Sequence, residues 1–220
     1  MKRCVYRAQC IKGCEEKTIE WVSQYYQNIR TLVEEESLMT LSIFKYKRHF
    51  FLYYECTGEE ILPDELFKQP EKVLLPWQGE EYERFWVPMM DVYHCAEPVS
   101  RDFWKRRGHI KCGNAKIVRL KPEMVSSYIY YHYQYQEEKP GDFAKYAAIY
   151  LYENIILMYT EQDDEPSVTP YKGKLDSNTT PENWHELMLK HFAPFDEKAV
   201  PVYNSWMNIE TVVNIFWGES

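Results

Sequence analysis

Three side chains on one expected helix could carry out proton transfer. Tyr128, His132 and Tyr135 are separated by four and then three residues, so a helix would present them on one face. Met124 and Val125 begin the same stripe, and we therefore expect the His132 imidazole to face the space between helix and sheet. An imidazole there can donate or accept a proton near neutral pH, which is general acid/base chemistry. The same spacing also suits a core histidine bonded to a tyrosine or a backbone carbonyl.

Two tryptophans are candidate platforms for a ligand ring. Trp86 lies in Arg84-Phe-Trp-Val-Pro-Met-Met-Asp-Val-Tyr, and Trp184 lies in Glu182-Asn-Trp-His-Glu-Leu-Met. We expect both stretches to form the second helix of their half of the chain. A flat indole can stack on the C–H face of a sugar ring, although a tryptophan on an amphipathic helix also fills a core. The candidate substrate-binding residues are Trp86, Trp184, Tyr150 and His185.

The elements that would position these residues occur in the same order twice. A strand, helix, strand order starts near Val5 and starts again near Lys116. A repeat of roughly 110 residues is too long for a solenoid unit, so each copy should be a small α+β domain that buries its sheet against its twin. The full order, β-α-β-β-α-β, is that of the ferredoxin-like unit. We therefore expect two domains, 1–112 and 113–220.

Hydrophobic spacing and turn signals place the individual elements. The expected strands are 5–11, 38–45, 49–56, 116–120, 146–152, 155–160 and 211–217, with one more beginning at Phe103-Trp104. The expected helices are 19–33, 82–93, 124–136 and 181–191. The polar stretch 162–180 contains two prolines and is expected to form an excursion at the surface.

Composition argues against several classes of partner. The net charge of −8, with 34 acidic and 26 basic residues, gives no basic footprint for nucleic acid or anionic lipid. No apolar run approaches the roughly 20 residues that span a bilayer, and 1–7 lacks the apolar core of a signal peptide, so we expect a cytoplasmic protein. The six cysteines are interpreted as reduced, small apolar residues. The six histidines are scattered, and His185-Glu186 lacks the second histidine of a zinc helix.

Three stretches resemble the L-rhamnose mutarotase family. Leu120-Lys-Pro-Glu-Met-Val-Ser-Ser-Tyr-Ile-Tyr-Tyr-His is similar to the family's opening, in which a strand end and x-Pro-acidic precede Tyr-x-x-x-His on a helix. Ala148-Ile-Tyr-Leu resembles its second strand. Arg84-Phe-Trp-Val-Pro-Met-Met-Asp-Val resembles its Arg-Trp-Trp-x-x-Met-x-Asp-Val helix. The chain is thus similar to two family subunits fused head to tail.

The resemblance implies both a fold and an activity. Family subunits pack sheet to sheet in pairs as a dimeric α/β barrel, so this chain would form an intramolecular version of that barrel. His132 would be the catalytic acid/base and Tyr128 its partner or second proton donor, with Trp86 and Trp184 contacting the sugar. The reaction would interconvert the anomers of a free monosaccharide such as L-rhamnose, because opening a hemiacetal ring needs one group to protonate the ring oxygen and one to remove a hydroxyl proton. No metal or cofactor is expected.

Departures from the family keep two alternatives open. The first copy has Ile19 and Ser23 where the tyrosine and histidine should be, which favours a non-catalytic sugar-binding or structural pseudo-dimer. The second alternative is an oxidative enzyme of the same barrel superfamily, because one fold supports many chemistries. If such an enzyme used haem, His132, His185 or His191 could supply the axial ligand.

Overall fold

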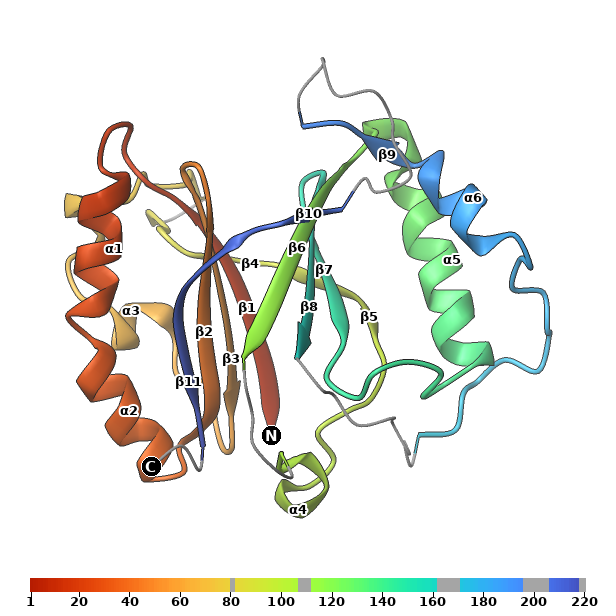
Figure 1. Ribbon diagram of the computed structural model, residues 1–220, viewed down its shortest axis with the longest axis horizontal. Helices are drawn as coiled ribbons and strands as arrows, with labels where there is room; N and C mark the ends of the chain where they lie inside the picture. Colours follow the sequence, from red (N-terminus) through yellow and green to blue (C-terminus); the bar gives the residue numbers. More distant parts are fainter. Residues whose placement is uncertain (80–81, 107–111, 162–170, 196–205, 218–220) are drawn as a thin grey trace. The chain divides into compact units, whose positions relative to one another are not determined.

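The chain is an α+β protein with two antiparallel sheets (Figure 1). The computed structural model describes residues 1–79, 82–106, 112–161, 171–195 and 206–217. Two compact units divide the chain. Unit 1 comprises Met1–Met89, Pro98–Cys112 and Glu210–Ser220, and unit 2 comprises Met90–Glu97 and Gly113–Ile209. This division differs from the expected 1–112 and 113–220 by two exchanged segments, 90–97 and 210–220.

Unit 1 is built on a five-stranded sheet in the order β11-β2-β3-β1-β4. Its strands are β1 (Lys2–Gln9), β2 (Leu38–Tyr46), β3 (His49–Cys56), β4 (Val87–Pro88) and β11 (Glu210–Phe216). Its helical elements are α1 (Glu15–Ser23), α2 (Tyr26–Glu34), α3 (Pro63–Leu66), the 3-10 turn η1 (Pro70–Lys72) and α4 (Arg101–Trp104). The expected strands 5–11, 38–45, 49–56 and 211–217 therefore all form strands.

Helices α1 and α2 cover one face of this sheet (Figure 1). Side chains of β1 alternate between faces, so Cys4, Tyr6 and Ala8 enter one apolar core together with residues from α1 and α2. The single helix expected over 19–33 is instead two helices. They separate at Tyr25, whose N–H bonds the carbonyl of Val22, three residues back, at 3.1 Å.

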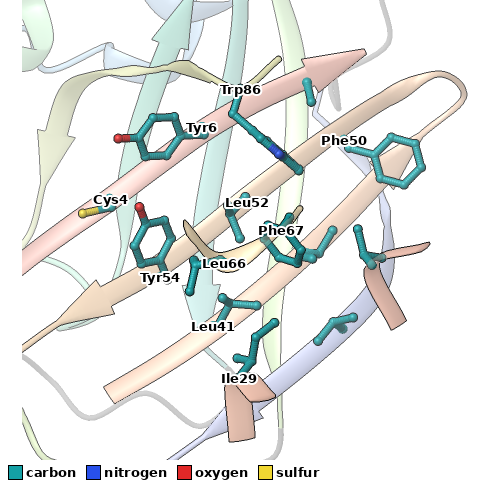
Figure 2. Packing of buried hydrophobic residues seen from close by; sticks show 14 of the residues in the cluster. Cys4, Tyr6, Ile29, Leu41, Phe50, Leu52, Tyr54, Leu66, Phe67 and Trp86 are labelled. Atoms are coloured by element: carbon teal, nitrogen blue, oxygen red, sulfur yellow. The ribbon is translucent and has the colours of Figure 1, made fainter. Parts of the chain in front are cut away.

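The segment after β3 takes the place of the second helix expected in this half. Phe67, at the end of the short helix α3, is fully buried. Its ring lies 5.6 Å from that of Trp21 and 5.9 Å from that of Trp86, and Figure 2 shows it beside Trp86 in the core. Each such ring pair adds about 0.5–1.5 kcal/mol beyond the burial of its apolar area. A loop thus fills the core space that a longer helix would occupy.

Unit 2 is built on a sheet in the order β10-β6-β8-β7-β5, with β9 also pairing with β6. Its strands are β5 (Met90–His94), β6 (Gly113–Leu120), β7 (Ala148–Tyr152), β8 (Ile155–Glu161), β9 (Phe192–Ala193) and β10 (Met207–Asn208). Its helical elements are the 3-10 turn η2 (Pro122–Met124), α5 (Val125–Glu138) and α6 (Trp184–Leu189). The expected strands 116–120, 146–152 and 155–160 and the helix 124–136 are present, and the helix expected over 181–191 is shorter.

Each sheet receives a strand from the other half of the chain. The segment that forms β4 at the edge of β1 continues into β5, which pairs with β7 of unit 2. In the same way, β10 pairs with β6, and the chain then continues into β11, which pairs with β2 of unit 1. The exchange is reciprocal, so neither half of the sequence contains a complete sheet.

The helix expected over 82–93 is wrong, because residues 82–86 form no helix and the rest of this stretch contributes to β4 and β5. Pro88 has no N–H and disfavours a helix interior. The pairing of β5 with β7 also shifts register between Asp91 and Tyr93, so the adjacent residues Val92 and Tyr93 both enter the core of unit 2. This irregularity breaks the alternation typical of a strand and produces a spacing that resembles helical periodicity.

The strand expected to begin at Phe103-Trp104 is also wrong. Arg101–Trp104 form the short helix α4, and the hydroxyl of Ser100 accepts a hydrogen bond from the N–H of Phe103 at 3.2 Å. Serine at this position caps a helix N-terminus by satisfying a backbone donor. The sequence suggested a strand residue at Trp104. In the structure Trp104 is the last residue of one helical turn in unit 1, and it is fully buried.

Residues 171–180 contain no helix or strand and bind the end of α5, while 162–170 lie outside the described residues. Glu137 accepts hydrogen bonds from the Tyr171 hydroxyl and the Lys174 N–H. Glu138 accepts hydrogen bonds from the backbone N–H groups of Thr179 and Thr180 at 2.9 and 2.8 Å. These bonds lower the pKa of both carboxyls. The last turn of α5 therefore holds this segment in place.

We expect Gly173→Ala to loosen the segment. A Cβ at this position would lie 1.9 Å from the carbonyl oxygen of Glu137, so the backbone must move away from α5. Overpacking of this kind costs about 1–3 kcal/mol. Faster hydrogen exchange at the Lys174 and Thr180 amides would report the loss. Gly58→Ala is the control, because its Cβ would meet nothing within 4 Å; equal exchange in the two variants would contradict the prediction.

Candidate functional site

His132 lies inside unit 2, on the face of α5 that packs toward the sheet. Its side chain is 5% exposed. Its ring centroid lies 4.0 Å from that of Tyr128 and 5.0 Å from that of Trp184. Tyr93 contributes a third ring at 6.2 Å. The expectation that His132 faces the space between helix and sheet is therefore met, and aromatic rings pack closely around it.

The hydrogen bond of His132 identifies which ring nitrogen carries the proton in its neutral form. Nδ1 lies 2.9 Å from the carbonyl oxygen of Tyr128, one turn earlier on α5, so the N–H at Nδ1 donates to that oxygen. Burial lowers the pKa of His132 to about 4, and the bond to Tyr128 offsets only part of this effect. Burial also raises the pKa of the Tyr128 hydroxyl. At neutral pH both side chains are uncharged, and the imidazole is a weak base.

The lowered pKa predicts how stability depends on pH. The pKa of His132 is about 4 in the folded chain and 6.5 in the unfolded chain. Between pH 6.5 and about pH 4 the unfolded chain therefore binds a proton at this side chain that the folded chain does not. The stabilisation is present above pH 6.5 and is lost as the pH falls toward 4, by up to about 3 kcal/mol. Urea unfolding between pH 7 and pH 4 should show a smaller decrease in the free energy of unfolding for His132→Leu than for the wild-type protein. His185→Ala, at an exposed position, is the surface control, and an unchanged slope in His132→Leu would contradict the prediction.

The other predicted site residues separate into three groups. Trp184, at the start of α6, joins the His132 cluster and also lies 4.9 Å from the ring of Tyr135. His185, the next residue, is exposed. Tyr150 is buried, but its neighbours Ile149 and Leu151 face the α5 side of the sheet. Because side chains alternate along a strand, Tyr150 points to the opposite face from His132.

Trp86 belongs to unit 1 and lies just before β4, not on a helix. Its side chain is 5% exposed and packs in the unit 1 core, where Phe67 is its ring neighbour. The expectation that Trp86 and Trp184 occupy matching places on matching helices is therefore wrong. Trp86 follows an isolated bridge between Trp77 and Arg84, whereas Trp184 begins a regular helix.

Sequence reasoning did not place two members of the cluster, Tyr93 and His191, near His132, although His191 was considered as an axial ligand. Tyr93 reaches it only because β5, from the first half of the chain, pairs with β7. His191 is fully buried, and its ring lies 5.9 Å from that of Tyr128. Its Nδ1 lies 2.9 Å from the Leu187 carbonyl oxygen and its Nε2 lies 2.9 Å from the Ser127 hydroxyl. The helix expected over 181–191 placed Leu187 and His191 at one helix end, but nothing in the sequence placed that end beside Tyr128.

The three histidines considered as axial ligands differ in their availability. Both ring nitrogens of His191 have partners within unit 2, and Nδ1 of His132 bonds a backbone carbonyl. His185 lies on the surface. Among the described residues, no three histidine, cysteine, aspartate or glutamate side chains form a group suited to a metal ion. No helix in the described ranges is long and apolar enough to cross a membrane.

Comparisons with known proteins give one distant likeness. No family model matches the chain, and no curated protein matches it. Among solved structures, the chain is similar to one described as a "Putative monooxygenase" from Fusobacterium nucleatum subsp. nucleatum ATCC 25586. The two share 8% sequence identity with a TM-score of 0.43, over 97% of this chain and 93% of that chain. A likeness this distant says nothing about the activity of this chain.

Proposed function

We propose that the chain is a non-catalytic pseudo-dimer in which the cluster around His132 is packed core. The observation that carries this proposal is the state of the imidazole itself, which is 5% exposed and 4.0 Å from the Tyr128 ring. Its Nδ1 is bonded to the Tyr128 carbonyl. A general acid/base must reach the proton that it transfers, at about 2.6–3.2 Å, and must titrate near the working pH. A side chain enclosed by rings, with its pKa lowered to about 4, meets neither condition.

The mutarotase function remains the second candidate, and one observation favours it. Tyr128, His132 and Trp184, which the family resemblance implies for the site, come together although Trp184 is 52 positions from His132 in the sequence. For this candidate, Trp184 would have to move aside, since it is only half-buried, and admit a sugar beside the imidazole. The two candidate functions therefore differ in whether Trp184, on α6, moves away from His132 in solution.

Saturation-transfer NMR separates the two functions. Full-length protein is mixed with a panel of free pentoses and hexoses that includes L-rhamnose, and the rate of anomer exchange is compared with that of His132→Ala. We expect no acceleration by either protein. Acceleration that is lost in His132→Ala, with the variant still folded, would establish the enzyme and overturn our proposal.

Thermal unfolding with the same sugars tests binding without catalysis. A ligand that binds only the folded state raises its stability by RT ln(1 + [L]/Kd), about 2.7 kcal/mol at 100 times Kd. Stabilisation without anomer exchange would identify a sugar-binding pseudo-dimer. Absence of both effects would leave the structural role. Trp184→Phe is the matched variant, because it keeps a ring in the His132 cluster while removing the indole platform.

The proposed architecture includes packing of the two sheets against each other as an intramolecular barrel. The support for this packing is that the sheet face turned away from the helices also has apolar side chains. On β3, Phe51 and Tyr53 alternate with the core residues Phe50, Leu52 and Tyr54. A sheet with apolar side chains on both faces needs cover on both. A crystal structure in which these faces are open to solvent would contradict this part of the proposal.

An oxidative enzyme, cofactor-free or haem-using, is the remaining alternative, and the described histidines fit the haem-using form poorly. His191 would have to give up its bond to either Ser127 or Leu187 before its ring could bind iron. We expect the purified protein to show no haem absorption band and to gain none when titrated with haemin. A stable band that disappears in His132→Ala or His191→Ala would favour the oxidative alternative.

A further inference from the structure

Residues 171–189, here called the cover segment, follow α5 from its last turn back towards its first. The segment contacts Glu138 at the C-terminal end of α5, and α6 then lies beside α5 (Figure 1). The Trp184 ring of α6 packs 5.0 Å from that of His132 and 4.9 Å from that of Tyr135. Trp184 is half-buried, so one side of it faces solvent while the other faces these rings. The cover segment is therefore part of the enclosure of His132.

The chain that follows the cover segment is fixed to the sheet. Phe192 and Ala193 form β9, which pairs with β6. Just before β9, the carbonyl of His191 accepts a hydrogen bond from the N–H of Lys121 at 2.8 Å. The fully buried His191 ring also places Nε2 2.9 Å from the Ser127 hydroxyl. Because backbone pairing and a buried side chain hold this end, we expect it to act as the hinge of any movement of the cover segment.

Residues 177–180 of the cover segment are held by one carboxylate, that of Glu138. Its Oε1 accepts hydrogen bonds from the Ser177 hydroxyl at 2.6 Å and from the Thr179 N–H at 2.9 Å. Its Oε2 accepts one from the Thr180 N–H at 2.8 Å, and the hydroxyls of both threonines also donate to this carboxylate. Burial opposes ionisation of Glu138, but these hydrogen bonds lower its pKa. The carboxylate therefore stays charged at neutral pH and keeps its donors.

The position of α6 depends on this attachment. Among the described residues, Glu138 is the last group of α5 that hydrogen-bonds the cover segment before Trp184. The neighbouring Glu137 binds the earlier residues 171–174. Within α6 itself, which has six residues, only Met188 is buried. A helix with so few buried contacts is held mainly by the chain on either side of it.

We propose that the Glu138 carboxylate is a latch, and that release of residues 177–180 from it opens the cover segment above His132. In the open form the segment turns about β9, and Trp184 moves away from the His132 ring. No strand pairing of the sheet is broken, so this opening needs less free energy than the unfolding of unit 2. The latch controls access to His132 whether the cluster around it is packed core or a ligand site, so the inference does not rest on the proposed function.

Diethyl pyrocarbonate, which acylates neutral imidazole, measures access to His132 in the native full-length protein. Digestion and mass spectrometry give the labelling rate at each histidine. We expect His132 of the wild-type protein to react at least about tenfold more slowly than the exposed His185. Glu138→Ala should raise the His132 rate at least about fivefold and leave His185 unchanged. Ser177→Asp, at an exposed position, should also raise the His132 rate, because it places a second carboxylate beside that of Glu138.

Glu182→Ala is the matched control, because Glu182 is an exposed carboxylate of the cover segment that lies outside the latch. Its His132 rate should equal that of the wild-type protein. His191, fully buried at the hinge, should stay protected in every variant. The proposal is overturned if His132 is as protected in Glu138→Ala as in Glu182→Ala, or if His132 and His191 become reactive together, since unit 2 would then unfold as a whole. The Ser177→Asp variant decides by the same two criteria if Glu138→Ala fails to fold.

Discussion

Replacing Arg106 with methionine is expected to lower the free energy of unfolding by about 3–5 kcal/mol. Nη1 and Nη2 of Arg106 donate to the two carboxylate oxygens of Glu55 at 2.6 and 2.8 Å. The side chains are 5% and 1% exposed, and Tyr53 donates a third hydrogen bond to Glu55 at 2.6 Å. Arg106 holds the pKa of Glu55 below its ordinary value despite burial. Removing the guanidinium would leave a buried, uncompensated carboxylate.

Urea unfolding measures this effect, and two further variants interpret it. Arg30→Ala removes the exposed ion pair between Arg30 and Glu34 on α2, so it should cost less than about 1 kcal/mol. The double variant Glu55→Gln with Arg106→Met should recover much of the loss, because no charge is left buried. A single Arg106→Met variant as stable as Arg30→Ala would show that the Glu55–Arg106 pair does not form as described.

Residues 1–112 expressed alone are expected to show no cooperative unfolding and to aggregate. This fragment lacks β11, which pairs with β2 from Lys45 to Thr40 and places Val213 and Ile215 in the unit 1 core. Without β11, the edge of β2 is open and can pair with other chains. The fragment also keeps β5, whose partner β7 is absent.

Co-expression of 1–112 with 113–220 is the matched test of strand exchange. Each fragment supplies a strand that the other lacks, so the pair should co-purify and unfold cooperatively although neither fragment does so alone. Calorimetry and size-exclusion chromatography would report both results. A monomeric 1–112 fragment that unfolds as cooperatively as the full-length chain would show that the first half completes its own sheet.

The positions of the main strands and of α5 follow from local patterns, and these patterns were sufficient. The register of β1 with β3 runs without a break from Lys2–Cys56 to Gln9–His49, whereas the local pattern predicted the first strand only over 5–11. The local patterns failed where a proline and a shifted register interrupted the strand, in 82–93. They also failed at Ser100, where one capping hydroxyl turned an apolar pair into a helical turn.

The sequence by itself determined which side chains share a face of α5, because three and four residues make one helical turn. Helical spacing alone therefore predicts that Tyr128, His132 and Tyr135 lie together on this face. Only the tertiary structure decided what surrounds them: Tyr93 arrives on an exchanged strand, Trp184 arrives on α6, and Tyr150 lies on the far side of the sheet. Spacing along the sequence determines which face of a helix a side chain occupies. Burial of His132, and with it the lowered pKa, depends on contacts between segments that are far apart in the chain.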